Sequence, residues 1–207
     1  MIKAWFPTFI YEAPLVRGGA AVLGRTNRVL LSECEKLRQR DNKGQRWSAK
    51  NYPGGYTSYD SWNRLHRTFS SFGALEKRLD RHVRAFAQHL ELDLSRAKLE
   101  MTDCWVNVMP RHTVHTLHLH PVATISGTYY VKTPRGSSRL RFEDPRLPSF
   151  MAAPPKRADC RPENLQQITY DVRAGQVLLW ESWLRHEVRP STIDAERVSV
   201  SFNYNWF

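Results

Sequence analysis

The sequence contains little cysteine. Its three cysteines, Cys34, Cys104 and Cys160, are far apart and odd in number, and no Cys-x-x-Cys pair occurs. A disulfide framework needs paired cysteines and a zinc ribbon needs closely spaced ones, so neither is expected. Reduced thiols are typical of the cytoplasm, where we expect this protein to work.

Long apolar runs are also missing. No stretch approaches the roughly 18 apolar residues that a membrane helix requires, and residues 1–7 lack the apolar segment of a secretory signal. We therefore expect no membrane partner. A glycine-rich phosphate loop, a Gly-x-Ser-x-Gly motif and a kinase signature are absent as well, which argues against the commonest nucleotide-binding and hydrolase classes.

Acidic residues are outnumbered by basic ones. Thirty-one Lys and Arg residues against 20 Asp and Glu residues give a formal net charge of +11. This charge favours anionic partners, but the basic residues are dispersed and form no run of five or six. A nucleic-acid-binding module with incidental histidines is therefore disfavoured. A small-molecule or peptide substrate of acidic character fits better, and a homodimer is one of the oligomeric states left open.

The length and composition are those of one globular domain. The 207 residues are 41% hydrophobic, 12% aromatic and 25% charged, which excludes disordered and fibrous chains. The sequence pattern changes near residue 96. We expect one domain, residues 1–207, with a helical N-terminal part (1–97) and an all-strand core (98–207).

Helical periodicity occurs twice in the N-terminal part. The longer apolar stripe, with spacings of three and four, consists of Leu75, Leu79, Val83, Phe86 and Leu90. An earlier helix, which we expect Thr26 or Asn27 to cap, carries Leu30, Cys34 and Leu37.

From residue 98 the sequence pattern predicts short strands separated by turn residues. The predicted strands are 105–109, 113–120, 125–132, 139–143, 166–172, 176–180, 186–189 and 197–206. Five prolines in residues 144–162 exclude regular structure there. Two helices followed by about eight short strands indicate an α+β protein whose body is a jelly roll, with the helices packed on it.

Four histidines fall within nine residues: His112, His115, His118 and His120. Because alternate strand residues share a face, His118 and His120 are expected to point the same way and His115 the opposite way. Two imidazoles on one face can bind a single metal ion, although two polar, solvent-facing strand residues would give the same pattern. A third candidate ligand, His186, follows the apolar strand 176–180.

Arg197 and Ser199 lie on one face of the last predicted strand. A planar guanidinium beside a hydroxyl is a good receptor for a carboxylate. The alternative is that Arg197 pairs with a neighbouring acid, Asp194 or Glu196.

Together these motifs resemble the Fe(II)- and 2-oxoglutarate-dependent oxygenases, and in particular a bacterial and phage group of that superfamily. The resemblance rests on His118-Leu119-His120-Pro121, on Ser126-Gly127-Thr128-Tyr129-Tyr130, on the distal His186 and on Arg197-Val198-Ser199. It covers most of the chain and is densest from residue 105 to residue 206.

The resemblance implies a double-stranded β-helix (the jelly-roll or cupin-like fold) and an oxidoreductase, a dioxygenase that hydroxylates its substrate. His118, His120 and His186 would bind Fe(II) as a facial triad. Arg197 would bind the distal carboxylate of 2-oxoglutarate, with Ser199 and Tyr130 as further contacts. These four residues, the three histidines and Arg197, are the expected catalytic set.

One position departs from the superfamily. His120 stands where the superfamily has an aspartate or glutamate ligand. Either the metal is held by three histidines, or His120 turns away and a water takes its place. A second possibility for the whole protein is a three-histidine, cupin-like metal oxygenase or isomerase that uses no 2-oxoglutarate, although Arg197-x-Ser199 argues against it.

Overall fold

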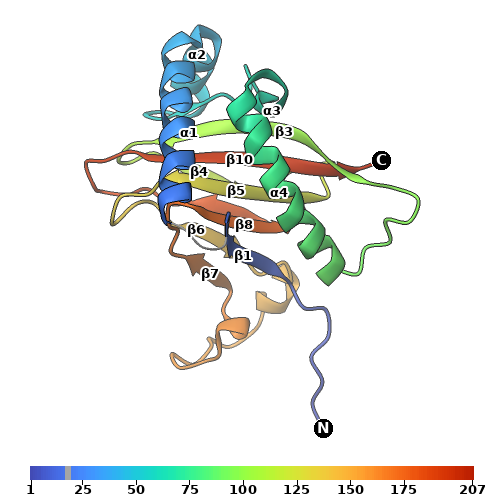
Figure 1. Cartoon of the computed structure of the whole chain (residues 1–207). Helices are drawn as coiled ribbons and strands as arrows, with labels where there is room; N and C mark the ends of the chain where they lie inside the picture. Colours follow the sequence, from blue (N-terminus) through green and yellow to red (C-terminus); the bar gives the residue numbers. More distant parts are fainter. Residues whose placement is uncertain (17–19) are drawn as a thin grey trace.

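The computed structural model describes residues 1–16 and 20–207, and it contains helices and antiparallel sheets (Figure 1). The helices are α1 (Ala20–Arg40), α2 (Asn42–Asn51), α3 (Leu65–Thr68) and α4 (Ser70–His89), with short 3-10 helices at Leu147–Phe150 and Pro162–Asn164. No helix in the described part of the chain is long and apolar enough to cross a bilayer. The α+β expectation is confirmed.

The strands form two sheets. They are β1 (Ile10–Pro14), β2 (Tyr56–Thr57), β3 (Leu99–Met109), β4 (His115–His118), β5 (Ile125–Lys132), β6 (Leu140–Glu143), β7 (Gln167–Tyr170), β8 (Gln176–Glu181), β9 (His186–Val188) and β10 (Arg197–Trp206). The major sheet has the order β1-β8-β5-β10-β3-β2, and the minor sheet has the order β4-β9-β6-β7. Each named strand pairs with its neighbours in antiparallel register.

Helices α1 and α4 cover one face of the major sheet (Figure 1). The predicted stripe of α4 is buried against that face except at Leu90, which is half-buried. Its partners include Val106, Val200 and Phe202, which point outward from β3 and β10. The interface is therefore a helix-on-sheet core, which burial of apolar surface stabilises at roughly 25 cal/mol per Å².

The expected cap of the first helix is wrong. Helix α1 is described from Ala20, so Thr26 and Asn27 lie inside it. The Thr26 hydroxyl donates to the carbonyl of Val22, four residues earlier, at 3.0 Å. Asn27 instead accepts a hydrogen bond from the hydroxyl of Tyr129 on β5. Thr and Asn are typical cap residues, but they can also lie inside a helix when the side chain finds a hydrogen-bond partner, as both do here.

Four elements of the N-terminal half, namely α2, α3, β1 and β2, were not predicted. Helix α2 begins after Asp41, whose carboxylate accepts from the Gly44 amide at 2.8 Å and from the Tyr56 hydroxyl at 2.8 Å. Strand β1 pairs with β8 and the two-residue β2 pairs with β3. Two-residue strands have no periodicity to detect, whereas Asp41 was a readable N-cap signal.

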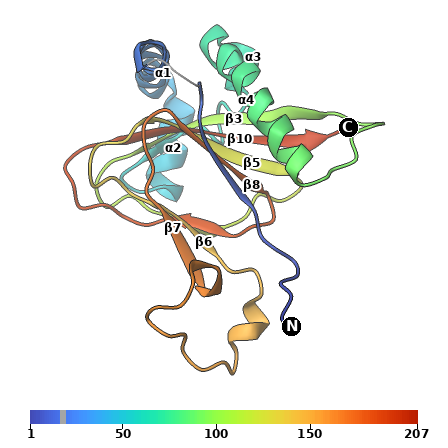
Figure 2. The ribbon, with the colours of Figure 1, turned by 60° about the horizontal axis from the view of Figure 1, so that its bottom comes forward.

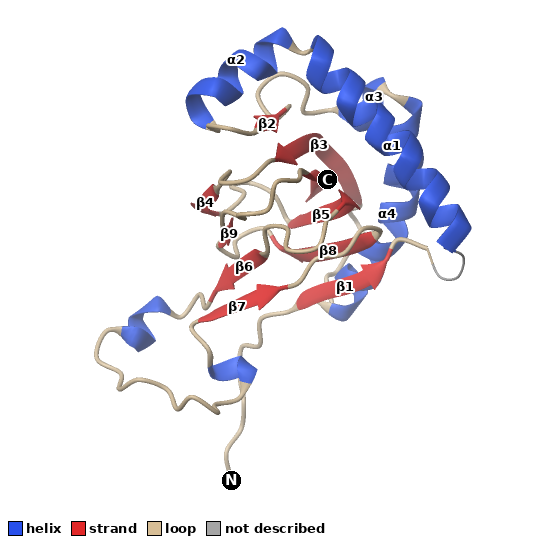
Figure 3. Ribbon diagram, turned by 90° about the vertical axis from the view of Figure 1, so that its left-hand side faces the viewer, coloured by secondary structure: helices blue, strands red, loops and turns tan. Residues whose placement is uncertain are grey.

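The long segment between β6 and β7 extends away from both sheets (Figures 2 and 3). It forms no strand, as its prolines predict, but Pro148 and Pro162 each lie in the first turn of a short 3-10 helix. Proline suits the first turn of a helix because its missing N–H has no partner to lose there.

A second core fills the space between the two sheets. Tyr130, Trp180, Phe142, Leu178 and Val188 are among its buried members. On β10 the side chains alternate strictly: those that face the helices are apolar, and those that face the minor sheet are Arg197, Ser199, Ser201 and Asn203. The inner face of the major sheet is therefore polar at its centre, and the candidate site lies there.

Substituting Gly127 should destabilise the fold. A Cβ at this position on β5 would lie 2.5 Å from a ring carbon of Phe202 and 2.6 Å from a methyl carbon of Leu179. Overpacking of this kind costs about 1–3 kcal/mol, so Gly127→Ala should unfold at a lower denaturant concentration. Gly24→Ala, whose nearest contact is 3.7 Å away in helix α1, should be neutral or stabilising. Equal midpoints for the two variants would contradict this account.

Candidate metal centre between the sheets

Two of the candidate ligands lie opposite each other on paired strands. His118 ends β4 and His186 begins β9, and the antiparallel register pairs them directly. Their ring centroids are 4.4 Å apart. Side chains directly opposite in an antiparallel pair point to the same face, so the register itself brings the two imidazoles together.

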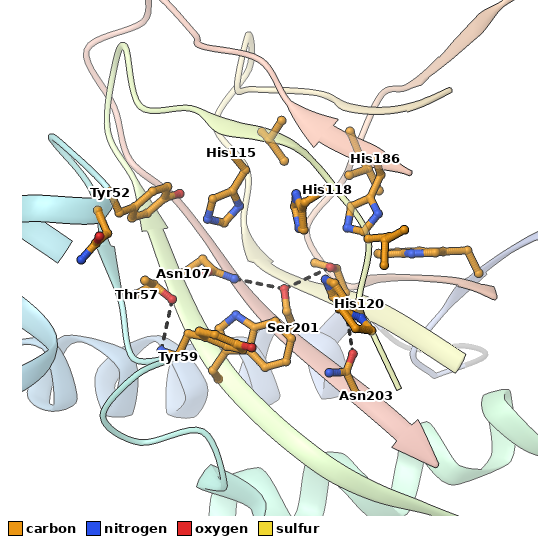
Figure 4. A pocket seen from close by; sticks show the side chains of 18 of the residues that line it. Tyr52, Thr57, Tyr59, Asn107, His115, His118, His120, His186, Ser201 and Asn203 are labelled. Carbon is orange, nitrogen blue, oxygen red and sulfur yellow. Dashed lines mark hydrogen bonds between the residues drawn. The ribbon is translucent and has the colours of Figure 1, made fainter. Parts of the chain in front are cut away.

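His120 lies just beyond the end of β4. Its amide donates to the carbonyl of Ser182 at 3.0 Å, which ties this segment to the turn after β8. Its ring centroid is 5.4 Å from that of His118 and 5.0 Å from that of His186. The three histidines present ligand atoms that all lie within 4.8 Å of one another (Figure 4). His120 therefore points toward the other two rather than away.

The hydrogen bonds of His118 and His186 determine which ring nitrogen is protonated. The Nδ1 atom of His118 lies 2.6 Å from the carbonyl oxygen of Thr116, and that of His186 lies 3.0 Å from the carbonyl oxygen of Leu184. A carbonyl oxygen can only accept, so each Nδ1 carries the proton and donates it. Each Nε2 is left with a free lone pair, which is the donor a metal needs.

Burial keeps these imidazoles neutral. It lowers the pKa of His118, lowers the pKa of His120 to about 4, and holds the pKa of His186 well below its ordinary value. The neighbouring imidazoles lower the pKa of His120 and His186 further. The site is thus in its metal-binding form at neutral pH, because a protonated imidazole has no lone pair to give.

The expectation for His115 is wrong. Simple alternation predicted that it points away from His118, yet it lines the same cavity and stacks on Tyr52 with a centroid distance of 4.3 Å. The register shows why: the four residues His115–His118 on β4 oppose only the three residues His186–Val188 on β9. An extra residue in one strand of a pair is a β-bulge, and it reverses the facing of the side chains beyond it.

Arg197 is buried at the other end of the cavity without an acidic partner. It is 3% exposed, one Nη donates to the Ser138 carbonyl at 3.0 Å, and Nε has no hydrogen-bond partner. Among the ion pairs of residues 1–16 and 20–207, Arg197 appears in none, and Glu196 pairs with Arg38 instead. The acid-pairing alternative for Arg197 is therefore wrong, and its guanidinium needs an anion from outside the chain.

Tyr130 and Ser199 lie next to this guanidinium. The Tyr130 ring centroid is 5.2 Å from Cζ of Arg197, and Tyr130 pairs with Ser199 across β5 and β10. Both side chains are buried, and neither hydroxyl has a partner in the described structure. A buried hydroxyl without a hydrogen-bond partner is unfavourable. The two hydroxyls beside Arg197 are therefore available to donate hydrogen bonds to a bound carboxylate.

The cavity between the two ends has a volume of about 260 Å³. Its remaining wall combines aromatic rings with neutral polar groups, namely Trp47, Tyr52, Tyr59, Trp105, Asn107 and Thr128. Of the described side chains that line it, Arg197 alone carries a permanent charge. Asn107 and Asn203 were not predicted as site residues from the sequence. The alternation of polar and apolar residues along 197–203 was the signal that could have found Asn203.

The comparisons with known proteins agree with this geometry. Residues 103–203 match the model of a family described as a 2OG-Fe(II) oxygenase, and this segment carries all three histidines and Arg197. These residues belong to the 2OG-Fe(II) oxygenase family. The chain is an Fe(II)- and 2-oxoglutarate-dependent oxygenase, as its motifs predicted.

Solved structures of low sequence identity share the oxygenase's fold. A prolyl-4-hydroxylase from Pseudomonas putida is 17% identical, with 96% of this chain and 92% of that chain covered and a TM-score of 0.60. HygX from Streptomyces hygroscopicus, solved with nickel and 2-oxoglutarate, is 16% identical with coverage of 96% and 83% and a TM-score of 0.63. The non-haem alpha-ketoglutarate-dependent epimerase SnoN from nogalamycin biosynthesis is 13% identical, with coverage of 96% and 76% and a TM-score of 0.67. No curated protein sequence matches the chain.

The donor set of the oxygenase suits both cofactors. Neutral imidazole nitrogens are good ligands for Fe(II), and three of them converge here. The unpaired guanidinium of Arg197, beside two free hydroxyls, suits a carboxylate. The cofactors are therefore Fe(II) and 2-oxoglutarate.

The unpaired charge of Arg197 leads to a stability prediction. Because a buried guanidinium without an anion is unfavourable, Arg197→Met should raise the free energy of unfolding of the cofactor-free protein by about 1 kcal/mol or more. Adding 2-oxoglutarate should raise the melting temperature of the wild type and leave that of Arg197→Met unchanged. Thermal unfolding with and without the dicarboxylate measures both effects. A less stable Arg197→Met protein would contradict the assignment of an unpaired charge.

Proposed function

We propose that this oxygenase hydroxylates a small molecule or peptide at a centre in which His118, His120 and His186 hold iron. The observation that carries the proposal is one cavity with two complementary ends. At one end three imidazole nitrogens lie within 4.8 Å of one another, and at the other Arg197 is buried without an acidic partner. Few functions other than binding a metal together with a carboxylate use both ends.

Our proposal extends to the architecture. The major and minor sheets would be the two halves of a double-stranded β-helix, with the cavity between them and residues 1–97 as a helical part of the same single domain. The polar inner row of β10 and the pairing of His118 with His186 across β4 and β9 support this arrangement. We also propose that the protein works in the cytoplasm, as its cysteine content suggests.

Arg197 would bind the distal carboxylate of 2-oxoglutarate. A guanidinium offers two parallel N–H donors to a carboxylate, and the buried hydroxyls of Ser199 and Tyr130 would complete its hydrogen bonds. The Tyr130 ring under the guanidinium keeps it in place. With its distal carboxylate at Arg197, the co-substrate would present its keto acid end to a metal held by the three histidines.

Iron and 2-oxoglutarate, when bound, supply the oxidising chemistry that breaks a substrate C–H bond. The chain's own residues would orient the reactants and exclude water. Trp180 packs 4.7 Å from the His186 ring and Phe142 lies 6.0 Å from it, so this side of the centre is apolar and closed. Tyr52, Tyr59 and Trp105 form the facing wall, where the substrate would lie.

The cavity also bears on the kind of substrate. The net charge of +11 favoured an acidic one, but the single permanent charge on the described cavity wall belongs to Arg197. If Arg197 holds the co-substrate, the part of the substrate near the metal meets amides, hydroxyls and aromatic rings. We propose that its reacting part is uncharged and that any acidic group lies outside the cavity, where basic surface residues can attract it.

Metal binding tests the three histidines. Replacing His118, His120 or His186 with alanine should each lower the iron content of the isolated protein from near one per chain to a small fraction of that, because two imidazoles bind far more weakly than three. His120→Asp restores a carboxylate and should retain iron. His112→Asn, on an exposed turn with φ 64°, is the control. Full iron content in His120→Ala would favour a water in place of His120.

Co-substrate affinity tests Arg197. Arg197→Lys keeps the charge and loses the two-pronged geometry, so 2-oxoglutarate should bind roughly 10- to 100-fold more weakly, about 1.4–2.8 kcal/mol. Anaerobic titration of the Fe(II) protein, followed by the weak visible charge-transfer band, measures this directly. Arg81→Lys, an exposed position on α4, should leave the affinity unchanged. Unaltered affinity in Arg197→Lys would move the co-substrate's carboxylate to another residue.

A further inference from the structure

A buried hydrogen-bond network lies behind His120, on the side away from the other two histidines. Its Nδ1 is 2.7 Å from Oδ1 of Asn203 and 2.8 Å from Oγ of Ser126, and Asn203 Nδ2 is 3.4 Å from a carboxylate oxygen of Asp103. Figure 4 shows Asn203 directly below the ring. We propose that Asp103, Asn203 and Ser126 are positioning residues. They would allow His120 to act as a metal ligand at a position where the superfamily has an aspartate or glutamate. We call these three residues and their hydrogen bonds to His120 the relay.

The Asp103 carboxylate determines the directions of these hydrogen bonds. The Asp103 carboxylate can only accept, so the Asn203 amide must turn its NH₂ group toward Asp103. The Asn203 carbonyl oxygen then faces His120 and can only accept in turn. His120 must therefore hold its proton on Nδ1, and its Nε2 lone pair is directed at the metal site.

Ser126 and Ser182 complete the network, and the Ser126 oxygen shares the Nδ1 proton of His120 with Asn203. The Ser126 hydroxyl donates to Asn203 Oδ1 at 2.9 Å, and the Ser126 and Ser182 hydroxyls are 2.7 Å apart. If Ser182 donates to Ser126, the oxygen of Ser126 is still able to accept from His120 Nδ1 at 2.8 Å. The imidazole is thus held from two sides in one ring orientation.

The relay is built into the major sheet. Asp103 on β3, Asn203 on β10 and Ser126 on β5 are direct partners in the register of adjacent strands. His118 and His186, by contrast, donate to backbone carbonyls two residues earlier in their own segments. His120 lies past the end of β4, and its ring contacts no such carbonyl in the hydrogen bonds of the described residues. Side chains from the major sheet accept its Nδ1 proton instead.

The relay also brings a negative charge close to a site that has no anionic ligand. Three neutral imidazoles leave the charge of a divalent metal ion uncompensated, whereas a carboxylate ligand would offset part of it. Asp103 is half-buried and is connected to His120 through Asn203. A carboxylate behind a metal-bound histidine raises the basicity of the imidazole, so Asp103 would supply part of the missing negative charge indirectly. This inference rests on the proposed metal site.

Cobalt(II) alone is the probe for the first test. Its visible absorption reports both affinity and ligand geometry, and no turnover is needed. Asn203→Ala and Asp103→Asn should each weaken cobalt binding by about 10- to 100-fold, the usual effect of removing a partner behind a ligand, and should change the absorption band. Asn205→Ala, two residues further along β10, is the matched control and should bind like the wild type. Unchanged affinity in Asn203→Ala would overturn the relay.

A second background separates positioning from general damage to the fold. In His120→Asp the ligand has no Nδ1–H to orient, so adding Asn203→Ala should cost less than threefold in cobalt affinity. An equal loss in both backgrounds would mean that Asn203 supports the sheet rather than His120, and the relay would be rejected. Melting temperatures of the four proteins show whether each variant is folded.

Histidine ring ¹⁵N–¹H correlation spectra of the metal-free protein test the relay without any metal. His120 should carry its proton on Nδ1 in the wild type and become a mixture of tautomers in Asn203→Ala. A proton on Nε2 in the wild type would overturn the relay. If cobalt fails to bind the wild type while the tautomer is as expected, the proposed metal site is wrong and the relay stands as a structural feature.

Discussion

The alternation of side chains along β10 is the constraint on which the rest of the structure depends. This strand lies between β5 and β3 in the major sheet, and every second residue faces one side. Val198, Val200 and Phe202 face the helices and form the larger core. The residues between them face the minor sheet and carry the polar chemistry. Because the period is two, neither set can move without the other.

This constraint links stability to function in a direct way. Helices α1 and α4 cover the apolar face, so the strand stays in register and its polar face stays directed into the cavity. Arg197 and Asn203 are six residues apart on that face and line the same cavity. In our proposals Arg197 is the carboxylate receptor and Asn203 supports His120. One rigid strand therefore sets the relation between the two ends. Sites built on sheet strands hold such geometry better than sites built on loops.

The histidine cluster shows where local sequence rules succeed and where they fail. His118 and His120 converge as strand alternation predicted, although β4 has already ended at His118. His115 faces the cavity against the prediction because a bulge inserts one residue between it and His118. A bulge depends on the partner strand, here β9, and no pattern within 113–120 reveals it. The contact between His118 and His186 likewise comes from a pairing across 68 positions of sequence.

Much of this protein could be read from its sequence alone. Strand-like segments bounded by turn residues predicted strands 125–132 and 197–206 with both bounds matching the structure, and the helical periodicity of the α4 stripe was correct. The three histidines and Arg197 were predicted as site residues from residue type, spacing and resemblance; the structure places all four on one cavity, and their roles stay a prediction. The start of α1, the strands β1 and β2, the facing of His115 and the support of His120 came only from the tertiary structure. The physical reason is that periodicity records which face of its own element a residue occupies, whereas register, bulges and hydrogen bonds between strands depend on segments far away in the chain.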